Sequence, residues 1–301
     1  MLPGEKGTFE QHMQNAEEIS RKLMHLVDRN YNLVITHGNG PQVGNLLLVT
    51  ELTSSQVPPM PLDVLVAQTE GSLGYILQQA LLNQIARTRR ERRVVTVVSQ
   101  VVVDRDDPAF LKPSKPIGPF LSREEAEKRK KELGWEIMDD AGRGWRRVVP
   151  SPAPKEVVQH RIIRDSVRAG HIVIACGGGG VPVLRKQDGT LEGVEAVIDK
   201  DLTSSVLAEQ VGADLLVILT DVPNVFLDWG KPTQRPLGAV TVGEMEVYAR
   251  EGQFARGSMG PKVRAVLNFL SAGGKRGLIT SPEKLDEALE GRAGTHFVGG
   301  Y

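Results

Sequence analysis

The sequence predicts an α/β protein with a mainly parallel sheet that is covered by helices on both faces. Short apolar runs rich in Val, Ile and Leu alternate along the chain with longer segments of helical periodicity. This alternation is typical of parallel sheets. Glycine-containing or Asp-containing turns directly follow several of the apolar runs. Because ligands of open α/β sheets bind beyond the carboxyl ends of the strands, these turns mark the edge where a site is expected.

The first part of the chain begins with an amphipathic helix. It is expected over about Phe9–Arg29, because Ile19, Leu23 and the apolar residues that follow recur at helical spacing. Pro41 suits the first turn of a helix, since its missing N–H needs no partner there. The other elements expected here are a buried strand at Asn32–Thr36, the turn His37–Gly40, a long helix over about Leu62–Arg89 and a β-branched core strand at Val94–Ser99.

Residues 104–152 interrupt this alternation. The segment is rich in Pro, Lys, Arg and Gly, and it contains Trp135 and Trp145. Glu124–Leu133 is expected to be a short, highly charged helix, and the segments that begin at the two tryptophans are expected to form a hairpin joined by residues 139–144. We interpret the segment as an inserted subdomain or lid. The alternative is a long surface excursion without a function, although long loops in compact domains are usually functional or disordered.

The remaining part of the chain returns to alternating strands and helices. Its strands are apolar runs, which is typical of a sheet buried on both faces. The strands are expected at His171–Cys176, Asp214–Thr220 and Arg276–Thr280, and the helices near Lys155–Ala169, Asp201–Val211 and Pro261–Ala272.

Composition excludes several classes of protein. Lys plus Arg and Asp plus Glu both number 37, so the zero net charge argues against a dedicated nucleic-acid binder. The basic run at residues 87–93 ends a helical segment and is better explained as a solvated helix end. Cys176 is the only cysteine, which excludes intrachain disulfides and cysteine metal clusters. No apolar run is long enough to span a membrane and the amino terminus has no signal-peptide pattern, so a cytoplasmic location is expected.

Three segments together indicate phosphate chemistry. They are Cys176–Gly180, Glu195–Asp201 and Gly257–Lys262, which combine glycine-rich turns with lysines and flanking aspartates. A glycine-rich turn before a helix presents backbone N–H groups and positive potential to an anion. A lysine just inside such a helix can reach the oxygens of a transferring phosphoryl group. The sequence therefore predicts phosphoryl transfer.

Several long motifs, in the same order, resemble the carbamate kinases of the amino acid kinase superfamily. The resemblance extends from about residue 10 to the carboxyl terminus. It implies a three-layer α/β/α sandwich with an inserted, protruding subdomain at about 104–152. The motifs are THGNGPQVGNLL (36–47), KPIGPF (115–120), DDAGRGWRRVVPSP (139–152), ACGGGGVPV (175–183), GVEAVIDKD (193–201), LVILTDV (216–222) and GSMGPK (257–262).

The resemblance also implies an activity, ligands and an assembly. The reaction is reversible phosphoryl transfer between carbamoyl phosphate and ADP, which gives ATP and carbamate. Residues 1–210 would bind carbamoyl phosphate and residues 211–301 would bind the nucleotide. Mg²⁺ would accompany ADP or ATP through phosphates and water, since no His, Cys and carboxylate cluster has metal-ligand spacing. The protein would be a homodimer without a nucleic-acid or membrane partner.

Site residues follow from the matching motifs. Lys200 and Lys262 would flank the transferring phosphoryl group, Lys115 would reach it from the insertion, and Asp201 would orient the lysines; a surface lysine or a structural salt bridge is the alternative. His37 is interpreted as structural, because this reaction removes no proton from a hydroxyl group. The residues expected to bind carbamoyl phosphate are Gly38, Asn39, Gly40, Gly177, Gly178 and Gly179, and those expected at the nucleotide are Thr220, Asp221, Val222, Gly257, Met259 and Lys262.

The start of the sequence differs from the family pattern. Carbamate kinases begin with a short strand and a Gly-Gly-Asn turn, whereas here Met1 directly precedes the segment LPGEKGTFEQ. The chain as written is therefore expected to lack a core strand and a phosphate-binding turn. This leaves two alternatives to an active carbamate kinase. One is a catalytically impaired ligand-binding homologue, and the other is a different small-acid kinase of the superfamily, to which the KPIGPF and AGRGW motifs would be foreign.

Adding the family's first strand and turn upstream of Met1, about 15 residues, is expected to raise both stability and activity. An interior parallel strand cannot be lost without leaving unpaired backbone groups and uncovered apolar faces. Both versions would be compared by melting temperature and by ADP-dependent ATP formation. Equal melting temperatures and equal rates would show that the added strand is dispensable.

Overall fold

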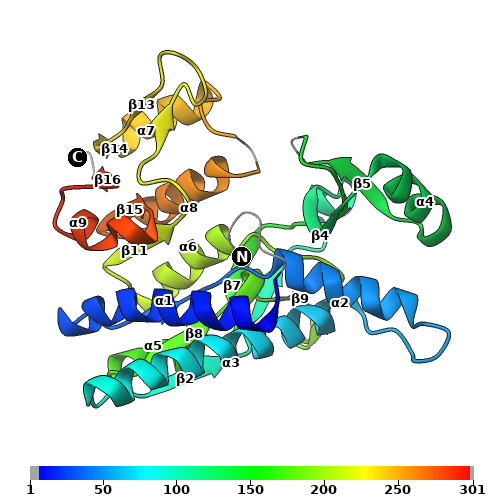
Figure 1. The fold of residues 1–301 in the computed structure, drawn as a ribbon, viewed down its shortest axis with the longest axis horizontal. Coiled ribbons are helices and arrows are strands. Elements are labelled where there is room, and N and C mark those ends of the chain that lie inside the picture. Colours follow the sequence, from blue (N-terminus) through cyan, green and yellow to red (C-terminus); the bar gives the residue numbers. More distant parts are fainter. Residues whose placement is uncertain (1–6, 141, 256, 299–301) are drawn as a thin grey trace.

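The computed structural model describes residues 7–140, 142–255 and 257–298. It has the predicted α/β architecture, with a sheet in the amino-terminal part, a second sheet in the carboxyl-terminal part and an insertion that projects from the first (Figure 1). Met1 and the hairpin residue Ala141, on which two sequence expectations fall, lie outside the described residues. Within the described ranges, no helix has the length and apolar character needed to cross a membrane.

The amino-terminal sheet is parallel where it approaches the predicted site. Its hydrogen bonds divide it into two sections. One has the order β1-β8-β2, and the chain continues from β2 and β8 into β3 and β9, which pair with each other in parallel in the second section, of order β10-β9-β3-β7. The outer strands β10 and β7 are antiparallel. The elements of this part are α1 (Phe9–Asp28), β1 (Val34–Ile35), α2 (Gly40–Leu52), α3 (Leu62–Thr88), β2 (Val94–Val97), β3 (Gln100–Val103), β7 (Pro154–Val157), α5 (His160–Arg168), β8 (Ile172–Ala175), η2 (Gly177–Gly179), β9 (Val181–Arg185), β10 (Leu191–Gly193) and α6 (Lys200–Val211).

Helices cover both faces of this sheet, as the sequence predicts. Strand β8 is buried along its whole length, and its alternate side chains enter different cores. Ile172 and Ile174 pack with residues of α1 and α3, whereas Val173 and Ala175 pack with residues of α5 and α6. Since successive side chains of a strand point to opposite faces, these two cores are the outer interfaces of a three-layer sandwich.

Several boundaries differ from the sequence expectation. The buried strand expected at Asn32–Thr36 covers only Val34–Ile35 and is half-buried, and the helix expected near Pro261–Ala272 is Met259–Ser271. The helix expected near Lys155–Ala169 begins only at His160, because Pro154–Val157 forms strand β7 against β3. Val157 is fully buried in the core of this pairing, so tertiary packing decides its conformation. The strand expected at Val94–Ser99 ends at Val97, and the chain resumes as β3 at Gln100.

The insertion is a small antiparallel sheet with one helix. Strand β6 lies between β4 and β5, which confirms the predicted hairpin of the two tryptophan segments. A capping box of Ser122 and Glu125 starts the helix, and Gly134 ends it in a left-handed conformation. Its elements are η1 (Pro108–Phe110), β4 (Lys115–Leu121), α4 (Arg123–Leu133), β5 (Glu136–Asp139) and β6 (Trp145–Val149).

The carboxyl-terminal sheet has the order β11-β15-β16-β14, with β11 and β15 parallel. Phe269 of its helix α8 is fully buried in the core below these strands. The elements are β11 (Leu215–Leu219), β12 (Phe226–Leu227), β13 (Arg235–Pro236), β14 (Ala239–Thr241), α7 (Val242–Arg250), α8 (Met259–Ser271), β15 (Arg276–Thr280), η3 (Pro282–Lys284), α9 (Leu285–Leu289) and β16 (Thr295–Val298).

Helix α1 connects the two sheets. Its residues Leu23 and Leu26 form a core with Leu285 of α9, and side chains of β1 and β11 pack against the same core. On its surface, Lys22 pairs with Glu283 and Arg29 with Glu290. Figure 1 shows α1 as a long helix beneath α9 of the carboxyl-terminal part. The apolar face that predicts this helix therefore packs against both the amino-terminal and the carboxyl-terminal part.

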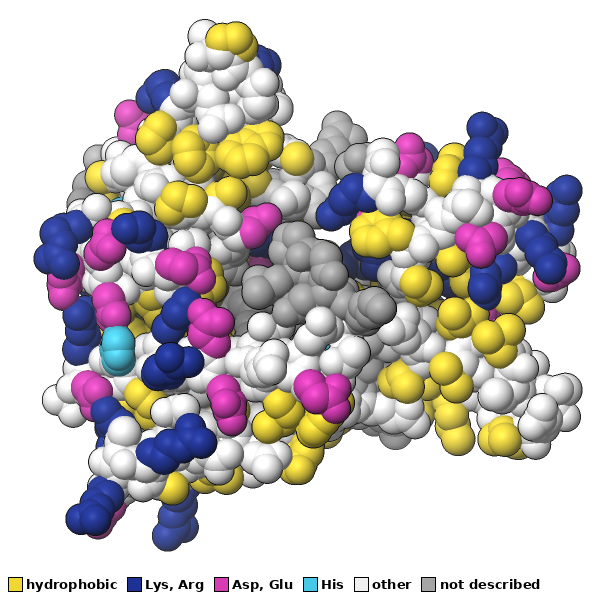
Figure 2. Space-filling view, viewed as in Figure 1, with side chains coloured by type: hydrophobic (Ala, Val, Ile, Leu, Met, Phe, Trp, Pro, Cys, Tyr) yellow, Lys and Arg dark blue, Asp and Glu magenta, His cyan; other side chains and the backbone are white. Residues whose placement is uncertain are grey.

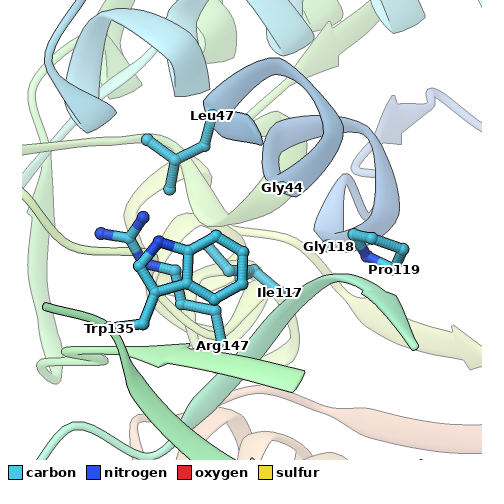
Figure 3. Close-up of a pocket in the computed structure, with 7 residues that line it drawn as sticks. All are labelled: Gly44, Leu47, Ile117, Gly118, Pro119, Trp135 and Arg147. Carbon is cyan, nitrogen blue, oxygen red and sulfur yellow. The ribbon is translucent and has the colours of Figure 1, made fainter. Parts of the chain in front are cut away.

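The insertion is anchored to α2 by close packing. The backbones of Gly44 and Gly118 approach so closely that a Cβ on Gly44 would lie 1.9 Å from the Gly118 nitrogen. Trp135 is 4% exposed, and its Nε1 donates to the Glu51 carboxylate of α2. The Arg147 guanidinium lies 5.2 Å from the centre of the Trp135 ring and also pairs with Glu51. Figure 3 shows Trp135 and Arg147 beneath Leu47 and Gly44 of α2.

Gly44→Ala is expected to separate the insertion from α2 and to lower the melting temperature. Its Cβ would meet backbone atoms of Ile117 and Gly118, which cannot move without shifting β4. Gly71→Ala is the matched control: Gly71 also lies in a helix, but nothing lies within 4 Å of its Cβ position. The control is expected to be neutral or stabilising by up to about 1 kcal/mol. Equal melting temperatures for the two variants, measured by differential scanning calorimetry, would refute this account of the junction.

Candidate active site

The amino end of helix α6 brings predicted site residues together. Asp201 is 7% exposed. Its Oδ2 accepts a hydrogen bond from Lys262 Nζ of α8 at 3.0 Å, and its Oδ1 lies 3.6 Å from Lys200 Nζ. One carboxylate therefore holds two ammonium groups that come from distant positions in the sequence. The predicted orienting role of Asp201 fits this arrangement.

Lys115 reaches the same helix end from the insertion. Its Nζ donates to Asp199 Oδ2 at 2.6 Å, so its partner is Asp199 rather than Asp201. The other oxygen of Asp199 caps α6 by accepting from the Asp201 and Leu202 backbone N–H groups. Burial favours a higher pKa for Asp199, but the Lys115 ammonium and the capping N–H groups outweigh it and lower the pKa below its usual range.

The two predicted glycine turns lie side by side. Strands β1 and β8 pair in parallel with Ile35 opposite Ile174, so both chains leave the sheet at the same edge. The Gly178 N–H donates to the His37 carbonyl oxygen at 2.7 Å. A Cβ on Gly178 would lie 2.1 Å from the Asn39 side chain, so only glycine allows the turns to meet. Its φ of 67° also favours glycine.

The turn that contains Gly38, Asn39 and Gly40 lies beside the lysines. A Cβ on Gly38 would be 3.4 Å from Lys200 Cδ, so the stem of Lys200 passes over this turn. Asn39 is buried, and its Nδ2 donates to Thr69 Oγ1 at 2.8 Å. Its amide donor therefore binds α3 in this structure. Gly40 starts α2 with Pro41 in the first turn, as predicted, which places the positive end of that helix here.

Polar contacts fix the Gly177–Gly179 turn to its neighbours. Thr203 Oγ1 of α6 donates to the Gly179 carbonyl oxygen at 2.9 Å. The preceding residue Cys176 has a φ of 53°, and its N–H donates to Ser99 Oγ at 2.9 Å. A left-handed conformation is costly for a residue other than glycine and recurs at functional sites. Cys176 is fully buried, as predicted, and burial raises the pKa of its thiol, so it is a poor nucleophile.

The residues predicted at the nucleotide lie in the carboxyl-terminal part. Thr220 follows β11, and its N–H donates to the Thr280 carbonyl oxygen of the neighbouring strand. Asp221 is exposed, and Val222 follows it in the same turn. Gly257 is exposed just before α8, whereas Met259 begins α8 and packs against the core of this part. These residues therefore lie on two segments of the carboxyl-terminal part, one after β11 and the other at the start of α8.

Two residues beside the candidate site have no individual role in the sequence prediction, although one of them, Asp199, lies within the predicted Glu195–Asp201 segment. Asp199 carried a recognisable signal, because an aspartate directly before a helix is a typical cap. Glu70 is buried in α3 behind the glycine turn, where its Oε2 accepts from the Ser99 N–H at 2.8 Å. The sequence also indicates that Glu70 is buried, since Val66, Glu70 and Gly74 recur every four residues on the buried face of that helix.

The arrangement suits the binding of a polyanion. Lys115, Lys200 and Lys262 converge on one helix end, and two carboxylates hold their ammonium groups in place. His37 does not add an obvious base, because burial and the Lys200 charge lower its imidazole pKa despite the Gly38 carbonyl contact. Preorganised ammonium and N–H groups stabilise charge that develops on transferring oxygens. The chemistry that fits is transfer of a phosphoryl group between two anions.

The chain is similar in sequence to known proteins over nearly its full length. The model of the amino acid kinase family matches residues 7–281. A carbamate kinase of Thermococcus kodakarensis is 50% identical over 298 residues, which cover 98% of this chain and 94% of that protein. A carbamate kinase of Pyrococcus horikoshii is 50% identical over 297 residues, with the same coverage.

Solved structures are similar in fold. The carbamate kinase from Giardia lamblia bound to citric acid matches with a TM-score of 0.95 and 38% identity, over 100% of this chain and 95% of that chain. The same enzyme bound to AMP-PNP matches with a TM-score of 0.91 and 39% identity, over the same shares.

Replacing Asp199 is expected to separate its two roles. Asp199→Ala removes the cap of α6 and the partner of Lys115, so it should destabilise the fold by about 1–2 kcal/mol. Asp199→Asn keeps a good cap and loses only the charge, so its effect should be smaller. Urea unfolding at neutral pH would measure both, and equal losses would contradict the assignment of the cap.

The pH dependence gives a second check on Asp199. A carboxyl whose folded pKa is lowered stabilises the fold above its unfolded pKa of about 3.9 and loses that contribution as pH falls through the folded pKa. The difference in unfolding free energy between the parent and Asp199→Asn should therefore be full at neutral pH and shrink in acid below about pH 4. A difference that grows in acid would have the wrong sign.

Proposed function

The chain belongs to the amino acid kinase family, and we propose that it is a carbamate kinase which transfers a phosphoryl group reversibly between carbamoyl phosphate and ADP. The resemblance seen in the sequence motifs is confirmed by the full-length similarity to carbamate kinases. In this reaction a β-phosphate oxygen of ADP attacks the phosphorus of carbamoyl phosphate. The bond from phosphorus to the carbamoyl oxygen breaks, and ATP and carbamate are the products.

One observation carries the proposal: the Asp201 carboxylate holds Lys200 and Lys262 together at the amino end of α6. The transferring group spreads negative charge over its nonbridging oxygens, and catalysis consists mainly of positioning and charge stabilisation. Two ammonium groups fixed by one buried carboxylate need little reorganisation when that charge develops. Lys200 and Lys262 flank the phosphoryl group in this proposal, and Asp201 positions them.

The remaining charge comes from the insertion. Lys115 lies on β4 and forms an ion pair with Asp199, next to the lysine pair. We assign Lys115 to the transferring phosphate, with Asp199 holding it while the site is free. Residues 104–152 then act as a lid that delivers a cation, and the contacts of α2 with Trp135 and Gly118 guide its movement.

The substrates occupy the two parts of the chain. Residues 1–210 bind carbamoyl phosphate at the turns of Gly38–Gly40 and Gly177–Gly179, and residues 211–301 bind the nucleotide near Thr220–Val222 and Gly257–Lys262. The placement of the first two turns beside Lys200 supports this division. The Giardia lamblia relative was solved with AMP-PNP, which supports a nucleotide ligand here.

Mg²⁺ enters with the nucleotide in this proposal. The carboxylates at the lysines, Asp199 and Asp201, are already paired with ammonium groups, so they fit an ion carried by phosphate oxygens and water better than a protein-bound ion. When bound, such an ion neutralises phosphate charge and leaves the three lysines to orient the transferring group. The homodimer and the cytoplasmic location stay predictions from the sequence.

Lys262→Ala is expected to lower ATP formation from carbamoyl phosphate and ADP by about 100-fold or more, since one preorganised charge at the transferring group is lost. The rate would be measured with purified protein by coupled detection of ATP. Lys275→Ala is the control, because Lys275 is 74% exposed and forms an ion pair with Asp214 at the surface. The control should keep the parent rate.

A folding defect would be separated from a catalytic one by the melting temperatures of both variants. If Lys262→Ala were folded and turned over within about threefold of the parent, the loss of charge stabilisation would be absent and the assignment of Lys262 would be wrong.

A further inference from the structure

A buried carboxyl group lies directly behind the glycine turn of the site. Glu70 of α3 is 1% exposed, and its Oε2 accepts from the Ser99 N–H at 2.8 Å. Its Oε1 is buried and makes no hydrogen bond with any described residue. A Cβ on Gly177 would lie 3.1 Å from Glu70 Cγ, so the side chain packs against the backbone of the turn. A buried polar atom without a partner is costly, and such atoms call for an explanation.

The surroundings of Glu70 offer no counter-charge. The groups that face it are the Ser99 N–H from the β2–β3 connection, the Gly177 N–H from η2, the Cys176 thiol, and the His37 imidazole, which lies on the same side of Gly177 as the Glu70 side chain. Among the described residues, no lysine or arginine forms an ion pair with Glu70. Burial and the nearby Lys200 keep His37 neutral by lowering its pKa. The carboxyl thus has N–H donors but no cation.

We propose that Glu70 is a positioning residue: the Gly177–Gly179 turn in front of it binds the anionic substrate well only while the Glu70 carboxyl group is protonated. The inference rests on the proposed function, because it concerns the acyl phosphate that binds at the Gly177–Gly179 turn. A protonated carboxyl is neutral and supports the turn by packing and by its bond from Ser99. When the proton leaves, a negative charge stands directly behind the backbone that faces the substrate phosphate, and the two anions repel each other through a poorly solvated interior.

The charge change falls in an accessible pH range. Burial raises the pKa of Glu70 to about 8, against the opposing effect of the Ser99 and Gly177 N–H groups. The group is therefore mainly neutral at pH 7 and gains charge as pH rises through about 8. By linkage, an anion that binds the protonated form better also raises the pKa of Glu70, so binding above pH 8 takes up a proton.

Glu70→Gln tests the proposal, because glutamine keeps the shape and the acceptor for Ser99 and stays neutral at every pH. KM for carbamoyl phosphate and kcat would be measured from about pH 6.5 to 9.5, on either side of the carboxyl's titration. In the parent, KM should rise about tenfold across this range while kcat changes less. In Glu70→Gln, KM should stay level beyond the changes that the substrates themselves cause. Glu246→Gln, on the exposed face of α7, is the control and should follow the parent.

Equal pH profiles of KM for the parent and a folded Glu70→Gln would overturn the proposal. A profile in which kcat alone differs would also overturn it, because it would assign Glu70 to the chemical step rather than to binding. A purely structural role would lower the melting temperature and leave the shape of the KM profile unchanged.

A binding measurement on the parent chain needs neither a folded variant nor turnover. Sulfate serves as the probe, because it is a dianion that does not titrate in this range. Calorimetry in two buffers of different ionisation enthalpy would count the protons taken up with sulfate near pH 8. Net uptake is expected, and no uptake, or release, would contradict the proposal. If the parent binds sulfate with proton uptake but forms no ATP, the proposed function fails while this inference stands.

Discussion

The contact on which the site depends is the pairing of one buried carboxylate, Asp201, with ammonium groups from two helices. Lys200 directly precedes Asp201 in the sequence, whereas Lys262 comes from α8 of the carboxyl-terminal part. Removing one partner of a buried ion pair leaves an uncompensated charge and costs about 3–5 kcal/mol. The pairing therefore adds to the apolar packing of α6 on α8, in which Ala208 shares a core with Val263 and Val266.

Backbone contacts made possible by glycine bring the rest of the site to this helix end. Gly178 meets Asn39, and Gly38 lies under Lys200, so the two turns and the lysines are packed against one another, with Asn39 and the Gly177–Gly179 turn buried. Helix α2 starts at these turns and carries the insertion at Gly44 and Glu51. One helix, α2, therefore contacts the insertion and also begins at the turn that contains Gly38 and Asn39. Figure 2 shows the charged insertion and the carboxyl-terminal part on opposite sides of the molecule's central face.

Local sequence signals were sufficient for most of the fold. The sequence predicts β8, β11 and β15 from their apolar runs, and α1 and α3 from their helical periodicity, to within about two residues. These predictions succeed because the local hydrophobic pattern determines which side chains each element buries. The glycine and lysine motifs predict candidate site residues, and the structure brings Lys115, Lys200 and Lys262 to one helix end. The insertion is visible in the sequence as a change of composition. Prediction from the sequence fails where tertiary packing imposes a conformation that the local sequence pattern does not indicate. Pro154–Val157 pairs with β3 as a strand, although the adjacent residues are helical.

What only the tertiary structure decided is which groups meet. The sequence determined that three lysines, two aspartates and two glycine turns are present, but a motif does not specify a partner far along the chain. Lys115 binds Asp199 rather than Asp201 because β4 projects it toward the cap of α6. Glu70 lies next to the candidate site only because α3 buries it behind Gly177, where solvent cannot stabilise its charge. Packing of segments that are distant in the sequence decides which charged groups are buried and which ones meet. The ion pairs and pKa shifts at this site therefore cannot be predicted from any single motif.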